Sequence, residues 1–471
     1  MSDEPQTHAQ THTRARPPAP APGGAAPQHT ATAWFPRLLI VGLVLAALNL
    51  RPAITSLGAL LEEVRTGLHM SGGVAGVLTS VPPLCFAVFG ITAPRLAHRF
   101  GPGAIVFAGM AAITAGLAIR PFAGGTIAFL AASALALMGI AVSNVLMPVI
   151  VKRYFPDRVG TMTGLYSMAL ALGTSLAAAA TVPLTDTLGG SWRAGLAVWA
   201  VLGALAVVAW FPLVRRGGGA GAGAVTVTSE GRGPGTNTGA GADPDAGARA
   251  GTDPGAATGT GARSAAGPAD RAGNAEAPVP RITRSRTAWA LGCFFGLQAT
   301  GAYITMGWMP QIFRDAGVSA GTAGVLLAVT MVMGVPLAFV IPRLATRMKN
   351  QGPIVVVLGL CGMSGYAGLH FAPAAGAWAW ALLLGVSNCA FPLALTMIGM
   401  RSRTGGGVVR LSAFAQSVGY LISIPGPTLV GTLYEHSGGW GAPLALMAGL
   451  MVPQVIVGIV AGRDRTIEDE G

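Results

Sequence analysis

The chain has 471 residues, of which 52% are hydrophobic and only 10% are charged, and its mean hydropathy is +0.58. Apolar runs of about twenty residues, the length that crosses a bilayer, recur along it, which excludes an ordinary soluble protein and indicates a membrane protein. The formal net charge is +12, but the basic residues flank the apolar runs instead of covering a polar domain, so no nucleic-acid partner is expected.

The chain begins with a polar segment, residues 1–33, rich in Pro, Ala, Thr, Gln and His. It lacks the basic start, apolar core and cleavage site of a secretory signal, so we expect a disordered cytoplasmic tail. An N-terminal six-helix bundle is expected over residues 34–216. Its apolar spans lie near residues 36–61, 74–94, 103–119, 124–151, 159–183 and 193–214.

Residues 217–280 change character, since Gly, Ala, Thr, Pro and Asp dominate and Leu, Ile, Met, Phe, Tyr and Trp are all missing. Such a composition cannot bury a core, so we expect a disordered cytoplasmic linker. A C-terminal six-helix bundle over 281–463 and a C-terminal tail over 464–471 complete the chain. The apolar spans of this bundle lie near residues 287–312, 321–342, 353–371, 376–399, 408–433 and 441–461.

The positions of Lys and Arg predict the orientation of these spans, because loops that stay in the cytoplasm collect basic residues. The tails, the linker and the even-numbered connections hold most of them. The odd-numbered connections hold only Arg65, Arg120, Arg193 and Arg314. We therefore expect a multi-pass protein of the cell membrane with both termini in the cytoplasm.

Two short motifs occur once in each half of the chain. PRLAHR begins at Pro94 after the second span and PRLATR begins at Pro342 after the eighth, and SNVLMP in the fourth span is matched by SNCAFP in the tenth. This repetition predicts an all-α membrane protein of twelve transmembrane helices in two pseudo-symmetric six-helix bundles, the arrangement that suits alternating access. The repeated basic connections are either markers of the cytoplasmic side or conformational gates, and we favour gating by Arg95, Arg99, Arg343 and Arg347.

The connection APRLAHRFG, from Ala93 to Gly101, resembles the helix 2 to 3 motif of the major facilitator superfamily, with Pro94 and His98 in place of the usual Gly and Asp. Four runs further resemble the cyanate and 2-nitroimidazole transporter family: NLRPAITSLGALL, LTSVPPLCFAVFGITAPRLAHRFG, FGLQATGAYITMGWMPQIF and LSAFAQSVGYLISIPGP. The resemblance implies the major facilitator fold and cyanate-like or nitroimidazole-like substrates.

Arg51 is an unexpected residue in the first span, ALNLRPAITS. Counted from Leu38, it lies roughly 20 Å along a helix at about 1.5 Å per residue, in a hydrocarbon layer of about 30 Å. A charge at that depth costs about 2.5–3.5 kcal/mol on insertion scales, so it should face the bundle interior and have a partner. No Asp or Glu lies in the central part of any span, which disfavours a salt bridge.

Two partners remain for Arg51. Pro52 removes a backbone donor and frees the carbonyl of Leu48, which Arg51 or Asn49 could bind to brace the kink. Alternatively the planar guanidinium, charged at every relevant pH, binds an anionic substrate, and we favour this second interpretation.

Other polar residues inside the spans are candidates for the same substrate site, although each is as readily explained by a hydrogen bond between helices. Gln298 lies near the position in the second half that matches Arg51. The full candidate set is Arg51, Asn49, Asn144, Gln298, Tyr303, Asn388, Gln416 and Tyr420.

We therefore predict a secondary active or facilitated transporter of a small anionic or polar planar solute. The alternatives are a multidrug or metabolite efflux transporter of the same fold and, from another class, a non-transporting membrane sensor. No nucleophile and base pair, metal-ligand cluster or phosphate-binding loop occurs in the sequence, so neither an enzyme nor a cofactor or metal is expected. The expected partners are the substrate and the lipid bilayer, and we expect a monomer.

Overall fold

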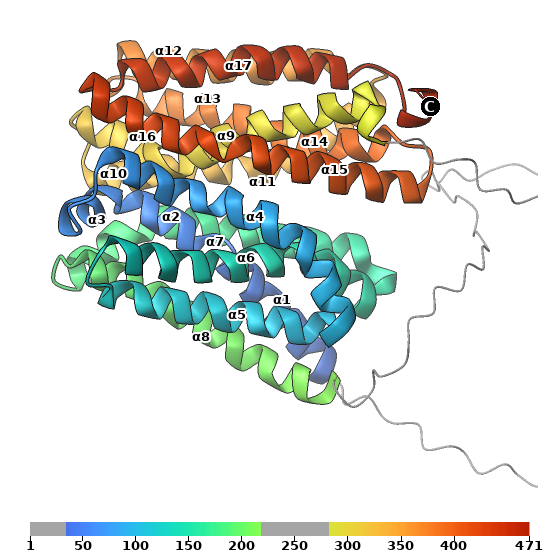
Figure 1. Cartoon of the computed structure of the whole chain (residues 1–471), viewed down its shortest axis with the longest axis horizontal. Helices are drawn as coiled ribbons and strands as arrows, with labels where there is room; N and C mark the ends of the chain where they lie inside the picture. The colour runs from blue at the N-terminus through green and yellow to red at the C-terminus, as the bar shows by residue number, and fades with distance from the viewer. Residues whose placement is uncertain (1–33, 218–281, 471) are drawn as a thin grey trace, which may run out of the picture.

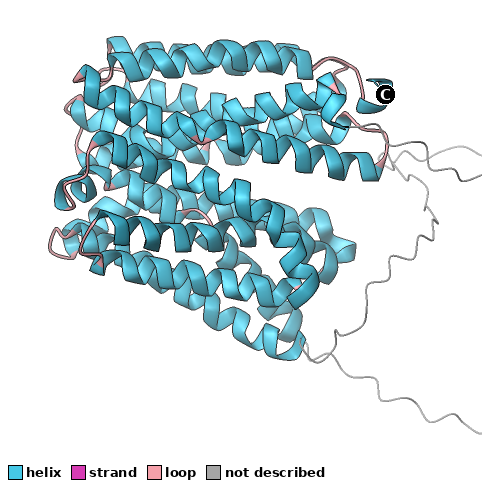
Figure 2. Cartoon of the chain, viewed as in Figure 1, coloured by secondary structure: helices cyan, strands magenta, loops and turns pink. Residues whose placement is uncertain are grey.

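The computed structural model describes residues 34–217 and 282–470. The expected tail 1–33 and nearly all of the expected linker lie outside the described residues. All regular structure in the described ranges is helical (Figure 2), because the long apolar runs must satisfy their backbone hydrogen bonds internally within a membrane.

The first half of the fold covers residues 34–217, and α1 to α3 together follow the first apolar span. Its helices are α1 (Trp34–Asn49), α2 (Pro52–Ala59), α3 (Leu61–Gly67), α4 (Gly72–Phe100), α5 (Pro102–Ile119), η1 (Arg120–Phe122), α6 (Thr126–Tyr154), η2 (Pro156–Arg158), α7 (Val159–Thr187) and α8 (Trp192–Gly217).

The second half covers residues 282–470. Its helices are η3 (Ile282–Arg284), α9 (Arg286–Asp315), α10 (Ala320–Val332), α11 (Gly334–Arg347), α12 (Gly352–Phe371), α13 (Ala377–Asn388), α14 (Ala390–Met400), α15 (Gly405–Ser423), α16 (Pro425–Ser437), α17 (Gly441–Ala461) and η4 (Ile467–Glu470).

The described segments contain 11 helical stretches that are long and apolar enough to cross a membrane, between Arg37 and Ala461. The twelfth membrane helix is α9, which has 30 residues but carries Gln298, Gln311 and Arg314. Most of its side chains are buried against other helices, and a helix enclosed by protein needs no apolar surface for lipid. The all-α fold of two six-helix halves is therefore confirmed.

Four of the membrane helices are interrupted, each one to three residues before a proline. The interruptions lie at Leu50–Arg51 before Pro52, Met333 before Pro336, Cys389 before Pro392 and Ile424 before Pro425. Proline lacks the N–H that would bond the carbonyl four residues earlier, so the helix ladder weakens there. A further break, at Leu60 between α2 and α3, is not followed by a proline. Of the four breaks before a proline, one lies in the first half and three lie in the second.

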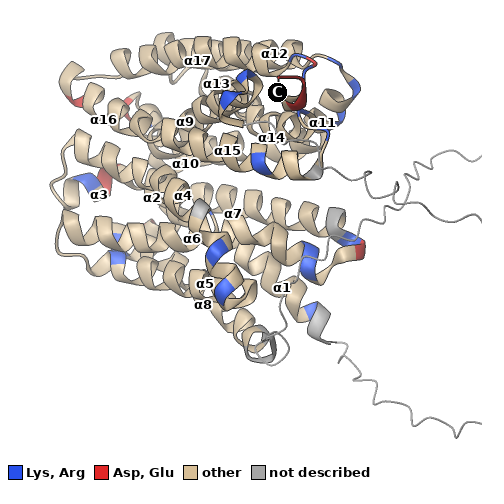
Figure 3. Cartoon of the chain, turned by 45° about the vertical axis from the view of Figure 1, so that its right-hand side comes forward, with Lys and Arg blue, Asp and Glu red and all other residues tan. Residues whose placement is uncertain are grey.

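All chain ends of the described segments lie on one side of the bundle, which we call the terminal face: the start of α1, the end of α8, the start of α9 and η4 (Figure 1). The opposite face carries α3 and the loops before α4, α10 and α17. Figure 3 shows Lys and Arg at helix ends of the terminal face.

The two halves make close contact near the opposite face. Ser80 and Thr428 lie with their hydroxyl oxygens 2.8 Å apart, and the backbone N–H of Gly73 donates to Glu435 Oε2 at 3.0 Å. Arg314 and Glu63 form a bidentate ion pair with N–O distances of 2.9 and 2.8 Å. Toward the terminal face the ribbons of the two halves separate (Figure 1).

Glycines allow the helices of the two halves to approach closely at the same face. A Cβ on Gly58 would lie 2.0 Å from the carbonyl oxygen of Met306, and one on Gly431 would lie 2.3 Å from that of Gly72. Backbones can meet at such positions only where no side chain intervenes. At these two positions the halves therefore meet backbone against backbone.

Candidate functional site

Arg51 lies at the interruption between α1 and α2, where the chain leaves helical geometry with φ −128° and ψ −27°. Its carbonyl accepts the N–H groups of Ile54 at 2.9 Å and Thr55 at 3.1 Å, which begins α2 with Pro52 as its first residue. Proline at this position suits a helix start, because its missing N–H would have no partner within the helix. The first span thus places Arg51 at the start of a half-helix inside the membrane.

The guanidinium of Arg51 faces the second half of the fold. It lies within reach of the hydroxyl of Tyr303 on α9, and Tyr420 on α15 is close enough to be affected by its charge. Arg51 is half-buried, and it takes part in none of the ion pairs found in residues 34–217 and 282–470. The neighbouring tyrosine hydroxyls are uncharged, so they do not neutralise the positive charge of Arg51.

Aromatic rings from both halves gather beside these tyrosines. Phe86 on α4 stacks on Tyr420 with ring centroids 5.1 Å apart. Phe295 on α9 packs edge to face on Tyr420 with ring centroids 5.2 Å apart. The ring of Phe391 on α14 is tilted against Phe295 with centroids 5.5 Å apart. A flat π-system could stack within such a group. Sequence reasoning missed Phe86, Phe295 and Phe391, since an aromatic residue in an apolar span carries no mark that separates a site from the core.

The amide candidates of the second half bond to one another. Gln298 Nε2 donates to the side-chain oxygen of Asn388 at 2.9 Å and to its carbonyl at 3.0 Å. That carbonyl is the one freed by Pro392 four residues later. Gln454 on α17 donates in turn to Gln298 Oε1 at 2.9 Å. In this state Gln298 and Asn388 tie α9, α13 and α17 together.

The remaining candidates differ in their surroundings. Asn49 is buried and donates to the carbonyls of Leu45 at 2.8 Å and Leu202 at 3.0 Å, so it does not bind the carbonyl of Leu48. Gln416 donates to Ser412 at 2.7 Å on its own helix. Asn144 is half-buried and has no hydrogen-bond partner among the described residues, which leaves its amide available.

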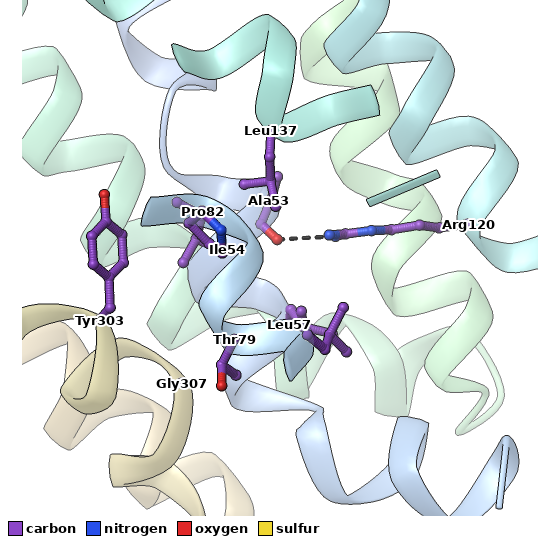
Figure 4. A pocket seen from close by; sticks show the side chains of 10 residues that line it. Ala53, Ile54, Leu57, Thr79, Pro82, Arg120, Leu137, Tyr303 and Gly307 are labelled. Carbon is purple, nitrogen blue, oxygen red and sulfur yellow. Dashed lines mark hydrogen bonds between the residues drawn. The ribbon is translucent and has the colours of Figure 1, made fainter. Parts of the chain in front are cut away.

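A cavity lies between the halves on the opposite-face side of Tyr303, and Arg120 reaches into it (Figure 4). The sequence places Arg120 in a connection, but its side chain is fully buried. Arg120 Nε donates to Ser133 Oγ and Nη1 to the carbonyl of Ala53, both at 2.9 Å. This second buried arginine was missed because a residue just after an apolar span reads as a loop residue.

The four gating candidates Arg95, Arg99, Arg343 and Arg347 are exposed on the terminal face. None of the ion pairs in the described parts of the chain includes them. No group of three or more His, Cys, Asp or Glu that could hold a metal ion occurs in the same parts.

Two six-helix halves packed against each other in a membrane bundle are the architecture of a secondary transporter. The chain belongs to the Major Facilitator Superfamily, whose family model matches residues 39–427. It is a multi-pass membrane protein.

Three characterised or named relatives align over most of their length. The uncharacterized transporter YycB of Bacillus subtilis is 31% identical, covering 91% of this chain and 94% of the relative. The 2-nitroimidazole transporter of Escherichia coli is 30% identical, covering 91% and 96%. The cyanate transport protein CynX of Escherichia coli is 26% identical, covering 88% and 95%. The resemblance to the cyanate and 2-nitroimidazole transporters is thereby confirmed.

Solved structures share the fold at low sequence identity. A bacterial homologue of the lysosomal transporter Spinster has a TM-score of 0.62 and 14% identity, covering 91% of this chain and 96% of that one. The nucleoside transporter NupG, as its D323A mutant, has a TM-score of 0.63 and 11% identity, covering 90% and 99%.

Proposed function

We propose that this transporter carries a small planar anion, and that Arg51 binds it. The observation that supports the proposal is the guanidinium at the helix interruption between the halves, which lies near Tyr303 and Tyr420 and forms no ion pair with an acidic side chain of the described residues. A permanent charge inside a membrane protein is expensive without a counter-charge. A bound anion supplies one and accepts the planar donor pair of the guanidinium.

The half-buried rings of Phe391 and Tyr420, which pack on Phe295, support a flat solute, since a planar π-system stacks on aromatic rings while its polar edge meets Arg51. Two relatives carry names of planar or linear small solutes, 2-nitroimidazole and cyanate. The same rings support a second candidate function, efflux of a neutral heteroaromatic compound, for which stacking would outweigh the charge. We include Asn144, whose side chain has no hydrogen-bond partner among the described residues, as a further polar contact of the substrate.

Transport is proposed to follow alternating access, with residues 34–216 and 281–463 as the two moving bodies. The terminal face is assigned to the cytoplasm, because the connections there are rich in Lys and Arg. The structure then corresponds to a state in which the extracellular side is closed. Arg95, Arg99, Arg343 and Arg347 are proposed to stabilise the alternative state, in which the cytoplasmic ends of the helices meet.

The test compares Arg51→Lys with Arg51→Gln in proteoliposomes, using labelled benzoate as the planar anion and 2-nitroimidazole as the neutral planar solute. Lysine keeps the charge but loses the planar fork, and glutamine keeps hydrogen bonding but loses the charge. We expect benzoate transport per folded molecule to fall about 10- to 150-fold in Arg51→Gln, as expected for a lost charged hydrogen bond of roughly 1.5–3 kcal/mol. The loss in Arg51→Lys, which keeps the charge, should be smaller, about fivefold.

Transport of 2-nitroimidazole should fall much less than transport of benzoate in Arg51→Gln. Equal losses for both solutes, with normal amounts of folded protein, would show that Arg51 only braces the chain at Pro52. If Arg51→Gln lowered only the transport of 2-nitroimidazole, the result would favour the efflux function.

A further inference from the structure

Arg120 has one guanidinium nitrogen with no partner, although the side chain is completely buried. Nε and Nη1 bond to Ser133 and Ala53, and the guanidinium carbon lies 5.5 Å from the ring centroid of Phe129. Nη2 is buried and has no hydrogen-bond partner among the described residues. The two hydrogen bonds of Arg120 therefore do not account for its third guanidinium nitrogen.

The positive charge of Arg120 is not neutralised by the cavity that it lines. The lining residues are Ala53, Ile54, Leu57, Leu78, Thr79, Pro82, Arg120, Leu137, Tyr303 and Gly307, which include no acid. Arg401, another fully buried arginine, differs: it bonds to the carbonyls of Ala461 and Gly462 and to the side chain of Gln351, and none of its buried nitrogens lacks a partner. Structural bracing explains Arg401 fully and Arg120 only in part.

The cavity is small in this state, with a volume of about 10 Å³, and it adjoins the surroundings of Arg51. Both arginines border the first turn of α2, since Arg51 precedes Pro52 and Arg120 bonds to the carbonyl of Ala53. Tyr303 lines the cavity and also faces Arg51, and in Figure 4 Arg120 and Tyr303 stand at the two sides of the view. Because the lining comes from both halves, separation of the halves at the opposite face would widen it.

We propose that Arg120 is a second anion-binding residue, which holds the planar anion between the Arg51 site and the opposite face. Its free Nη2 points to an anion with an oxygen or nitrogen acceptor, such as a carboxylate. In the state described here α2, α4 and α9 confine the cavity, and in the state open to the opposite face the anion meets Arg120 before it reaches Arg51. The inference rests on the proposed transport of an anion.

The experiment measures half-saturation by labelled benzoate separately from each face, in proteoliposomes sorted by the accessibility of a C-terminal tag. We expect Arg120→Gln to raise KM from the opposite face about tenfold, with less than about a twofold change from the terminal face. Arg120→Lys, which keeps the charge, should raise KM from the opposite face by a smaller factor, and it serves where Arg120→Gln yields too little folded protein.

Two control variants separate binding from bracing. Ser133→Ala removes one of the bonds to Arg120 but leaves its charge, and Arg65→Gln removes an arginine of the same face that is outside the cavity lining. Both should keep wild-type KM values from the two faces. A rise in Ser133→Ala equal to that in Arg120→Gln would overturn the proposal in favour of bracing.

The outcome for Arg51 separates the two proposals from each other. If Arg51→Gln impairs benzoate transport while Arg120→Gln changes KM equally from both faces or from neither, the second site is refuted and the proposed function stands. If Arg51→Gln and Arg120→Gln both leave benzoate transport unchanged, both proposals fail.

Discussion

The two faces of the membrane bundle differ in how the halves of the fold meet. At the opposite face they are joined by the Arg314–Glu63 ion pair, by Ser80 with Thr428, and by backbone contact at Gly58. At the terminal face Arg95 and Arg343, from the repeated connections, are both exposed. No hydrogen bond or ion pair between residues 34–217 and 282–470 is found at that face.

The difference indicates that close helix packing contributes more than ionic interactions to the state described here. Backbone contacts at glycines gain dispersion energy only at close range, so they are lost together when the helices separate. The arginine-rich connections at the other face have no such shape match in this state. We expect these connections to contribute in the alternative state, in which they approach each other. Changes at the two faces should therefore shift the equilibrium between the states in opposite directions.

The largest effect is expected from Gly58→Ala, which would break the contact at the opposite face. The new Cβ would lie 2.0 Å from the carbonyl oxygen of Met306, and overpacking of this kind costs about 1–3 kcal/mol. That corresponds to a roughly 5- to 150-fold shift between two states. Labelling of a cysteine introduced at Thr79 should become faster from the opposite face. Gly90→Ala, where nothing lies within 4 Å, is the matched control and should leave labelling unchanged.

A smaller shift in the other direction is expected when Arg95 and Arg99 are both changed to Gln. If these side chains stabilise the state closed at the terminal face, their loss favours the state described here by roughly fivefold. A cysteine introduced at Asn144 should then label faster from the terminal face. The same double change combined with Gly58→Ala should partly restore the wild-type balance, and unchanged labelling in both backgrounds would refute gating by these arginines.

The ion pair between Glu63 and Arg314 should contribute less than Gly58. Its side chains are 31% and 22% exposed, and partly exposed pairs contribute about 0.2–1 kcal/mol. Glu63→Gln, Arg314→Gln and the double variant form a thermodynamic cycle, measured by opposite-face labelling. We expect a coupling of about twofold that shrinks at 1 M salt, whereas a salt-independent coupling would contradict a simple surface ion pair.

The smallest effect concerns Glu470, which fastens η4 to the start of α9 on the terminal face. Glu470 accepts from the hydroxyls of Ser285 at 2.6 Å and Thr287 at 2.7 Å. Burial raises the pKa of this carboxyl, but these hydrogen bonds outweigh burial and lower the pKa below its ordinary value. A lowered pKa stabilises docking above the unfolded pKa of roughly 4.3, and this is lost as the pH falls through the folded pKa.

Hydrogen exchange at the first turn of α9 tests the docking of Glu470. Protection there should be unchanged from pH 8 to pH 5 and should decrease below about pH 4, after correction for intrinsic exchange. In Glu470→Gln the protection should be weaker and should no longer depend on pH. A pH dependence that persists in Glu470→Gln would assign the effect to Glu468 or Asp469 instead.

Most of the fold could be predicted from the sequence, because membrane spans are specified by length and hydropathy alone. Even α9, which contains two glutamines, was predicted as the apolar span near residues 287–312. The positions of the interruptions were less accessible. Pro52 and Pro392 interrupt their helices, whereas Pro148 and Pro310 lie within continuous ones, and that choice depends on the neighbours that accept or replace the lost bond.

The candidate site was only partly accessible to sequence reasoning. Depth in a span singled out Arg51, and the structure brings Tyr303 and Tyr420 close to it. Pairing between helices cannot be derived from one sequence, so nothing indicated that Gln298 bonds to Asn388. Arg120 follows an apolar span at the opposite face, and its inward direction is set by the short η1 turn, which no pattern in the sequence marks.

The interruptions are unevenly divided between the halves. Of those that precede a proline, the first half has one, beside Arg51, and the second half has three, at Met333, Cys389 and Ile424. A helix that lacks one of its backbone hydrogen bonds bends more easily than a continuous one. We therefore expect the second half to change curvature during the cycle, with its helices hinging at mid-membrane, while the first half turns as a stiffer block that carries Arg51 and Arg120.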